Sequence, residues 1–411
     1  MSLMSYSPKK NKKSDSDPDN IIVEPQIIEP QTDSDNIESP TDPDNIELPT
    51  YSTDSDNIVV ESATNTDNIV VKSPNNQPKN DTELNNINGY KLIRKMGEGS
   101  FGKVYVAVKK NNKYIIKFQK IKKNNKYGLL NIIKEINVLR RITEYNKDCG
   151  VSTITQLCLI DIFLHFDDNL YFCIVNNYIP NSVELSDVIS NNKEYVIDTK
   201  NIIIMFYILI LQLNTLHKLD IIHGDIKPNN IIIQKKLNND KYSIKNALFI
   251  DYGLSCIDTC HLSGTPMYMA PEILYKYVEN IFNISLNLKF KHIKSLYDYK
   301  KTDVFSLGLT FYEILHDGHL PYYINIEKFK KISSLNLMNI ENKKDIKSYL
   351  GIIKIYNSNS MNKSNYSLGT KKENTFLNKI IDSMINPLPK YRITSEKLYK
   401  EFKNFITLNY N

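Results

Sequence analysis

Tryptophan is absent from the sequence, and no stretch of about 20 apolar residues, the length that a membrane-spanning helix requires, occurs. The longest apolar run, at 201–213, is shorter than that and is interrupted by Gln212. We interpret this run as a buried core helix and predict no membrane span. The N-terminus also lacks the apolar segment of a signal peptide, so we expect an intracellular protein, cytoplasmic or nuclear.

Cysteine is also scarce, with five residues in 411. Few cysteines and no export signal predict reduced thiols rather than disulfides. Cys256, Cys260 and His261 lie close together in the sequence and raise the possibility of zinc. A structural zinc site needs four ligands, however, and no second pair of ligands is present, so we do not predict one.

Negative charge is concentrated at the N-terminal end. Residues 1–71 contain four Lys and fifteen Asp or Glu, a net charge of −11; because the whole chain carries +6, residues 72–411 carry +17. The hexapeptide TDSDNI, or a close variant, recurs five times at irregular spacing, with Pro residues interspersed. We predict a disordered acidic tail over residues 1–89. Partner docking, phosphorylation and folding back on the basic remainder are the alternatives.

The pattern changes at Tyr90. Apolar and polar residues alternate from there to residue 121 with Gly and Asn turns, which predicts three antiparallel strands. Residues 128–145 have helical apolar spacing, 170–179 are typical of a strand, and the chain after 180 is mostly helical. We therefore predict an α+β fold. A small β-rich lobe with one helix, about 90–178, precedes a larger, mainly helical lobe, about 179–411.

A glycine-rich segment, GEGSFGKV, joins the first two predicted strands. Glycines allow backbone N–H groups to approach phosphates. The spacing is shared with dinucleotide-binding folds, but there a helix follows, whereas here a strand follows. No Gly-Lys-Ser or Gly-Lys-Thr closes the segment, so it is not a Walker A loop. The residues predicted to bind a nucleotide here are Met96, Gly97, Glu98, Gly99, Ser100, Phe101, Gly102, Lys103 and Val104.

A lysine is also needed to contact the nucleotide phosphates. The string VAVKK suggests Lys109, but Lys109 lies only seven residues beyond Gly102 and an Asn-Asn-Lys turn follows it, so it ends the second strand. Lys117, in the middle of the third predicted strand, is the better candidate. Its predicted acidic partner is Glu135, the first carboxylate that follows it, on the predicted helix.

The segment IIHGDIKPNNIII, at 221–233, carries the strongest chemical signal. It brings Asp225, Lys227 and Asn230 onto one short loop, and Asp251 follows in FIDYGLS. A base, a cation and two oxygen-bearing metal ligands in this order fit phosphoryl transfer. Carboxylate and amide oxygens are ligands that Mg²⁺ accepts.

Together these motifs resemble those of the eukaryotic-type Ser/Thr protein kinases, over about residues 90–411. MAPEIL, at 269–274, resembles the family's APE motif, and SGTPMYMAPE, at 263–272, its substrate-binding loop. The resemblance implies a bilobal fold, ATP and Mg²⁺ as cofactors, and protein Ser or Thr hydroxyls as phosphoryl acceptors. In that case Asp225 and Lys227 are catalytic, and Asn230 and Asp251 bind the metal.

The resemblance implies further contacts. Thr265 should bond near Asp225 and Lys227, Asp303 should hold the backbone of the loop, and Arg392 should pair with Glu272. Adenine should lie against Met96, Val104, Ile115 and Ile232, with Asn176 just before the hinge at 177–179.

Gly224 departs from the family pattern, because an Arg that clamps a phosphorylated activation loop usually stands there. We therefore do not expect activation by loop phosphorylation. The HGD and DYG motifs resemble the vaccinia-related kinases and kinases of large DNA viruses; a viral protein would act in the host cell or virion. Two extra stretches, about 277–298 and 333–375, are expected to be lengthened surface loops.

Two other functions are compatible with parts of the sequence. The chain could be a pseudokinase or docking scaffold, although no catalytic position is lost, or a small-molecule phosphotransferase, although those generally lack the APE motif. We expect a monomer that acts on a protein substrate. Binding to nucleic acid is disfavoured because the Lys residues are spread over the chain instead of forming one patch.

Overall fold

The computed structural model describes residues 86–99, 102–122, 126–148, 157–190, 198–238, 241–257, 260–282, 296–321 and 361–410. All of them belong to one of the two compact units into which the chain divides, residues 70–411. The acidic repeats of the predicted tail lie outside the described residues, as do Ser100, Phe101 and Cys149.

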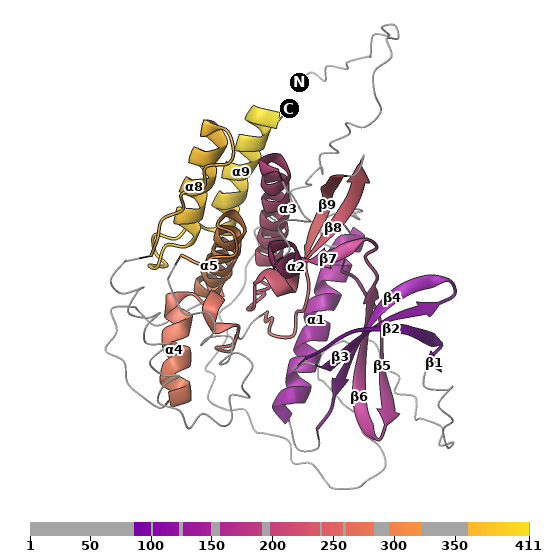
Figure 1. The fold of residues 1–411 in the computed structure, drawn as a ribbon. Helices are drawn as coiled ribbons and strands as arrows, with labels where there is room; N and C mark the ends of the chain where they lie inside the picture. Colours follow the sequence, from indigo (N-terminus) through magenta and orange to yellow (C-terminus); the bar gives the residue numbers. More distant parts are fainter. Residues whose placement is uncertain are drawn as a thin grey trace, which may run out of the picture. The chain divides into compact units, whose positions relative to one another are not determined.

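An antiparallel sheet of six strands forms the first part of the described chain (Figure 1). Its strands lie in the order β1-β2-β3-β4-β6-β5. Their bounds are β1 Asn86–Ile87, β2 Tyr90–Gly99, β3 Gly102–Lys109, β4 Asn112–Lys120, β5 Leu159–Asp167 and β6 Asn169–Asn177. The three strands predicted from Tyr90 onward and the strand at 170–179 are thus confirmed, whereas sequence reasoning missed β1 and β5.

The sheet has two different faces because side chains alternate along each strand. On one face, Tyr90, Ile116, Phe118 and Cys173 belong to a small cluster of buried residues. The opposite face carries Lys117, and Ile174, its partner in register, belongs to a second and much larger cluster that includes helix α1, Lys126–Asp148. The predicted helix at 128–145 is therefore confirmed, and it packs on the Lys117 side.

The rest of the described chain is mainly helical, as predicted. Its helices are α2 Leu185–Ser190, α3 Thr199–Lys218, α4 Pro271–Phe282, α5 Leu296–Leu315, α8 Lys371–Met384 and α9 Ser395–Tyr410. A small sheet, β7-β8-β9, lies beside α3; its strands are Ser182–Glu184, Ile231–Asn238 and Lys241–Phe249. Short 3-10 turns occupy Pro228–Asn230 and Pro266–Tyr268.

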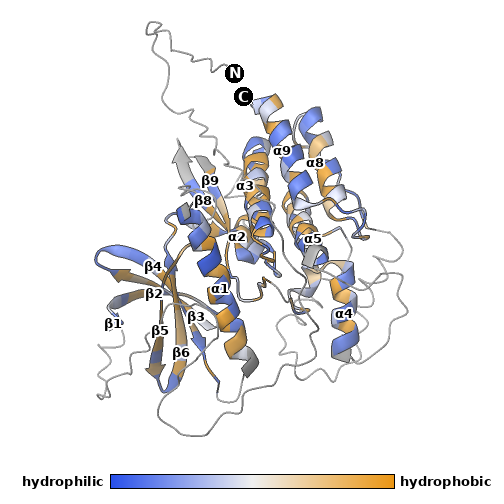
Figure 2. Ribbon diagram, turned by 180° about the vertical axis from the view of Figure 1, so that it is seen from behind, coloured by the Kyte–Doolittle hydropathy of each residue, from blue (hydrophilic) through white to orange (hydrophobic). Residues whose placement is uncertain are grey.

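Helix α3 contains the longest apolar run and is largely buried. Asp198 caps its N-terminus by accepting a hydrogen bond from the Asn201 N–H. In Figure 2 this helix is predominantly hydrophobic, while α1, α8 and α9 each show a hydrophobic and a hydrophilic side. Among the described residues, α3 alone is long and apolar enough to cross a bilayer, but its burial identifies it as a core helix.

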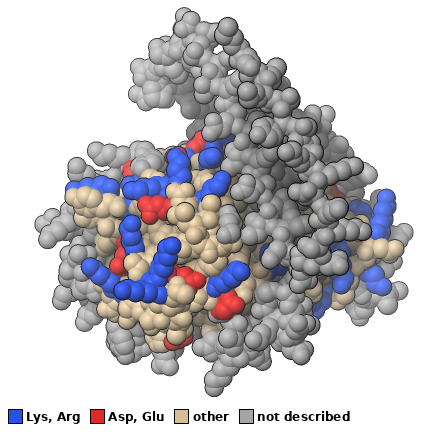
Figure 3. Space-filling view, turned by 90° about the horizontal axis from the view of Figure 1, so that it is seen from above, with Lys and Arg blue, Asp and Glu red and all other residues tan. Residues whose placement is uncertain are grey.

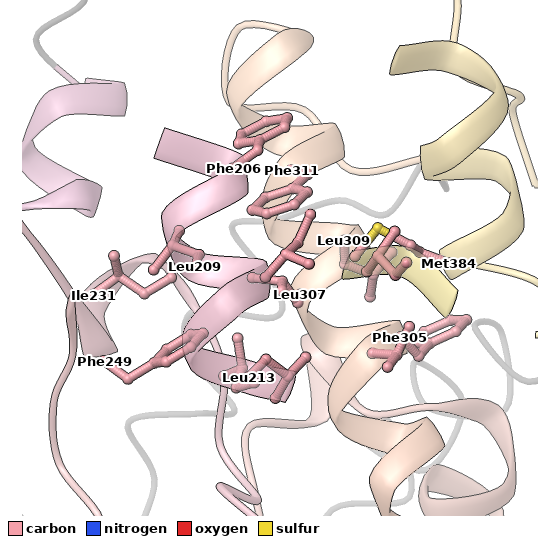
Figure 4. Close-up of a cluster of buried hydrophobic side chains, with 14 of the residues drawn as sticks. Phe206, Leu209, Leu213, Ile231, Phe249, Phe305, Leu307, Leu309, Phe311 and Met384 are labelled. Atoms are coloured by element: carbon pink, nitrogen blue, oxygen red, sulfur yellow. The ribbon is translucent and has the colours of Figure 1, made fainter. Parts of the chain in front are cut away.

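The centre of the helical core lies between α3, α5 and the small sheet (Figure 4). Phe206 of α3 stacks on Phe311 of α5 with ring centroids 3.5 Å apart. Burial of each such side chain contributes roughly 1.5–3 kcal/mol. At Gly308 a Cβ atom would lie 2.7 Å from the Cβ of Met384, so this glycine permits α5 to approach α8 closely.

Two contacts implied by the kinase resemblance are confirmed here. Arg392 forms a two-pronged ion pair with Glu272, at 2.7 and 3.0 Å. The carboxylate of Asp303 accepts hydrogen bonds from the N–H groups of His223 and Gly224, at 2.8 and 3.0 Å.

Two expectations need correction. Cys256 and Cys260 form a disulfide, so these thiols are not reduced and do not form a zinc pair in this structure. The ends of the predicted insertions are helical rather than loops: residues 277–282 belong to α4, 296–298 to α5 and 371–375 to α8. Residues 283–295 and 322–360 lie outside the described residues.

Charged residues on the face shown in Figure 3 are mixed. Lys and Arg side chains form several separate groups there, and Asp and Glu side chains lie between them. This distribution matches the expected spread of Lys residues and gives no single basic patch on that face.

Candidate active site

The glycine-rich segment forms the connection between β2 and β3. Gly99 pairs with Gly102, and Gly97 pairs with Val104. Gly102 has a φ of +124°, and a Cβ atom there would lie 1.8 Å from the main-chain O of Phe118. Only glycine fits such a close approach of β3 to β4.

Lys117 lies at the centre of a charged cluster drawn from three separate segments. Its Nζ is 2.8 Å and 3.0 Å from the carboxylate oxygens of Glu135 on α1, and 2.7 Å from Oδ1 of Asp251. The side chains of Lys117 and Glu135 are 11% and 4% exposed, whereas that of Asp251 is 30% exposed. The cluster is therefore closed at the α1 end and open at Asp251.

The pKa values of Lys117 and Asp251 both favour the charged forms. Burial lowers the pKa of Lys117, but the charges of Glu135 and Asp251 outweigh burial, so its pKa is raised overall. Burial raises the pKa of Asp251, but the charge and hydrogen bond of Lys117 outweigh it, so its pKa is lowered.

Gly253 allows the chain to pass beside this cluster. A Cβ atom at Gly253 would lie 3.2 Å from Oδ1 of Asp251 and 3.4 Å from Nζ of Lys117. Asp251 itself has a φ of +61°, a left-handed conformation that costs free energy and tends to occur at functional sites. The local backbone therefore holds Asp251 toward Lys117 at some cost.

A second polar cluster surrounds Asp225. Thr265 donates a hydrogen bond to Oδ1 of Asp225 (2.7 Å), and Nζ of Lys227 lies 2.8 Å from Oδ2. Lys227 also donates to Oγ1 of Thr265 at 2.7 Å. The implied contact of Thr265 with both residues is thus confirmed, and it joins the 263–272 segment to the HGD loop, residues 223–225.

Asn230 connects the two clusters. Its Nδ2 donates to the main-chain O and to Oδ2 of Asp225, at 2.8 and 2.9 Å. Its main-chain O accepts the Ile250 N–H at 2.9 Å, which places Asp251 next to it. Within the described residues, no hydrogen-bond donor reaches Oδ1 of Asn230. The amide oxygen of Asn230 and the carboxylate of Asp251 could therefore hold a hard cation such as Mg²⁺.

Hydrogen bonds from buried side chains fix the main chain of the HGD loop. Asp303 on α5 accepts bonds from this loop and lies 3.2 Å from Nε2 of His217. The hydroxyl of Ser255 donates to the main-chain O of His223 at 2.8 Å. His223 is fully buried, and burial lowers the pKa of its imidazole.

Not every predicted nucleotide-binding side chain faces Lys117. Val104 is opposite Lys117 in register, but Lys103 is opposite Phe118 and so lies on the other face of the sheet. Glu98 pairs with Lys95 at 2.5 Å on the surface, and Met96 is exposed. Lys103 and Glu98 can therefore contribute backbone rather than side-chain groups. Ser100 and Phe101 lie outside the described residues.

Lys109 and Gln119 show what the sequence could and could not identify. Lys109 ends β3, and its Nζ lies 4.0 Å from the Tyr90 ring centroid, away from the charged cluster, as its rejection implied. Gln119 was missed: its Nε2 donates to Oε2 of Glu135 at 2.5 Å. The available signal was its position two residues after Lys117, on the same face of the strand.

The protein kinase domain family matches residues 90–402 of the chain, a range that contains both clusters. The chain belongs to the protein kinase family. Calcium-dependent protein kinase 4 of Plasmodium berghei is 26% identical over 273 residues, which are 59% of this chain and 43% of the relative. CBL-interacting serine/threonine-protein kinase 18 of Arabidopsis thaliana is 29% identical over 245 residues, 57% of this chain and 39% of the relative.

A third relative, R436 of Acanthamoeba polyphaga mimivirus, is provisionally named a serine/threonine-protein kinase and is 27% identical over 252 residues. The match covers 50% of this chain and 78% of that relative. The chain spans less than half the length of the Plasmodium and Arabidopsis relatives. These distant relatives suggest Ser/Thr specificity at the family level.

Proposed function

We propose that this kinase domain transfers the γ-phosphoryl group of ATP, with Mg²⁺, to Ser or Thr hydroxyls of a protein substrate. The observation that carries the proposal is the joining of two clusters. Lys117, Glu135 and Asp251 form one, Asp225 and its partners form the other, and Asn230 connects them. A cation, a base and oxygen ligands are what phosphoryl transfer needs side by side.

Each residue has a role that its contacts support. Asp225 orients the acceptor hydroxyl and takes its proton, because one of its oxygens can exchange the Thr265 contact for the substrate. Lys227, 2.8 Å from Asp225, offsets negative charge on the transferring group. Lys117, held by Glu135, binds phosphate oxygens, and the backbone at Gly97, Gly99 and Gly102 approaches them.

The residues present fit a magnesium ion. Oδ1 of Asn230, which accepts no hydrogen bond from the described residues, and the ionised, partly exposed Asp251 are hard oxygen donors, which suits a cation that keeps several waters. When bound, Mg²⁺ would neutralise charge on the phosphates. The finer resemblance to vaccinia-related and large-virus kinases stays a prediction.

The test is transfer of labelled phosphate from ATP to myelin basic protein or casein. Asp225→Asn should lower kcat by about 10²–10⁴-fold, the usual contribution of a general base. Asp187→Asn, an equal change at an exposed residue of α2, should leave kcat unchanged. Equal labelling by wild type and Asp225→Asn would contradict the proposal, and phosphotyrosine instead of phosphoserine or phosphothreonine would contradict the specificity.

Binding separates an active kinase from a pseudokinase scaffold. Wild type should show a thermal shift with ATP and Mg²⁺, and removal of Mg²⁺ with EDTA should reduce that shift. A chain that shows no shift and no transfer would be a scaffold.

A further inference from the structure

One buried polar atom near the candidate active site has no assigned role. Asn176, in β6, is 8% exposed, and its Oδ1 is fully enclosed without a hydrogen-bond partner in the described part of the chain. A buried acceptor that lacks a donor costs roughly 1–3 kcal/mol. Such an atom is unusual in a folded protein and calls for an explanation, such as a ligand that supplies the donor.

The neighbouring residue shows that an asparagine here can be satisfied. Oδ1 of Asn177 accepts a hydrogen bond from the Cys158 N–H at 2.7 Å, and so ties β6 to the start of β5. Oδ1 of Asn176, the preceding residue of the same strand, accepts no comparable bond from any described residue. The difference points to a role for Asn176 outside the fold itself.

Strand register shows which way Asn176 faces. Lys117 pairs with Ile174, and Ile115 pairs with Asn176. Since side chains alternate along a strand, Asn176 lies on the same face as Lys117, displaced along the sheet by two residues, about 7 Å. Cys173 and Val175 face the other way and belong to the cluster on the opposite face.

This displacement matches the dimensions of a nucleotide. Lys117 and the glycine turn mark the phosphate end, and the base is separated from the phosphates by the ribose. Ile115 and Asn176 lie on the same face beyond Lys117, so a base seated against Ile115 would lie beside Asn176. This step rests on the proposed function, since it takes Lys117 to be the phosphate-binding residue.

We propose that Oδ1 of Asn176 accepts a hydrogen bond from the exocyclic 6-amino group of the bound purine, and so selects adenine nucleotides through a side chain. The 6-amino group is a donor that would satisfy the enclosed acceptor. A purine without a 6-substituent would leave Oδ1 unpaired. A 6-oxo purine would require the amide of Asn176 to rotate so that Nδ2 faces the base.

The experiment measures the Kd of the full chain with Mg²⁺ for ATP and for purine riboside 5′-triphosphate, which lacks only the 6-amino group. Wild type should bind ATP about tenfold more tightly, the effect of one net hydrogen bond of about 1.4 kcal/mol. In Asn176→Leu, which removes the acceptor at similar volume, this ratio should fall by about tenfold. Asn137→Leu, the same change at an exposed residue of α1, should keep the wild-type ratio.

The outcomes separate this proposal from the proposed function. Equal ratios in wild type and Asn176→Leu, with ATP still bound, would overturn the role of Asn176 and leave the kinase proposal intact. Equal affinity of wild type for the two nucleotides would also overturn the role of Asn176, even if the Leu variant did not fold. Failure of wild type to bind ATP at all would overturn both.

Discussion

Two buried ionic groups, one within the helical region and one centred on Lys117 of the first sheet, differ in how completely they are enclosed. In the helical region, the side chains of Arg392 and Glu272 are 0% and 2% exposed, and Arg392 also donates to the main-chain O of Lys301 and Asn386. In the other group, Lys117 of β4 and Glu135 of α1 are also largely buried, but the third member, Asp251, is 30% exposed.

The difference shows which group serves the fold and which serves the site. A fully enclosed pair has no access to a ligand, so its charges can only fix α4 against the segment before α9. An ionic group with one open member retains a charged atom that a ligand or cation can reach. We therefore expect loss of the first group to reduce stability and loss of the second to reduce activity.

The largest effect is expected from Glu272→Ala, which leaves Arg392 buried and without its counter-charge. Removal of one partner of a buried pair typically costs about 3–5 kcal/mol. Urea denaturation should therefore show a strongly lowered midpoint. Glu396→Ala, which breaks the exposed Lys400–Glu396 pair of α9, should leave the midpoint unchanged. A urea midpoint close to that of wild type for Glu272→Ala would contradict the idea that the enclosed pair stabilises the fold.

Lys117→Met, in the partly open group, should reduce activity more than stability. Loss of a group that stabilises charge in the transition state typically lowers kcat by about 10²–10³-fold. Its effect on stability should be smaller than that of Glu272→Ala, because Gln119 still donates to Glu135. Lys109→Met, away from the cluster, should retain activity. Equal losses in the two Lys variants would contradict the assignment of Lys117.

Much of this contrast could be predicted from the sequence. The position of Lys117 followed from counting residues between the glycine turn and the third strand, and the Glu272–Arg392 pair followed from the motifs around them. The resemblance also identified Thr265 and Asp303. Those contacts depend on motifs that are local and regularly spaced.

Other features depend on tertiary context and could not be predicted. Strand β5 carries charged and polar residues such as Asp161 and His165 among its apolar ones, so its pattern is ambiguous until it pairs with β6. The Cys256–Cys260 disulfide contradicts an expectation drawn from composition, which says nothing about the distance between two side chains. The unpartnered oxygen of Asn176 becomes visible only when strand register is known.

Gly224, in the HGD loop, tests whether the backbone conformation of that loop requires glycine. It has a φ of +79°, and a Cβ atom there would lie 2.7 Å from the main-chain O of Leu254. Gly224→Ala should therefore reduce the free energy of unfolding by about 1–3 kcal/mol. Gly97→Ala is the matched control, since a Cβ atom there meets nothing within 4 Å. Equal stability of the two variants would contradict the explanation that the backbone conformation at position 224 requires glycine in place of the usual Arg.

The smallest effect concerns His223, which lies beneath the same loop. Burial lowers the pKa of its imidazole and outweighs the charges of Asp303, Asp225 and Asp251, which raise it. The unfolded state, with a pKa near 6.5, therefore binds a proton more readily than the folded state. The stability from the neutral imidazole is complete above about pH 6.5 and is lost as pH falls toward the lower folded pKa, with a limiting slope of about 1.4 kcal/mol per pH unit. Urea midpoints between pH 5 and 8 should fall less steeply for His223→Asn than for wild type, whereas His319→Asn, at an exposed residue, should follow wild type. Superimposable curves for wild type and His223→Asn would mean that the buried imidazole does not contribute to the pH dependence of stability.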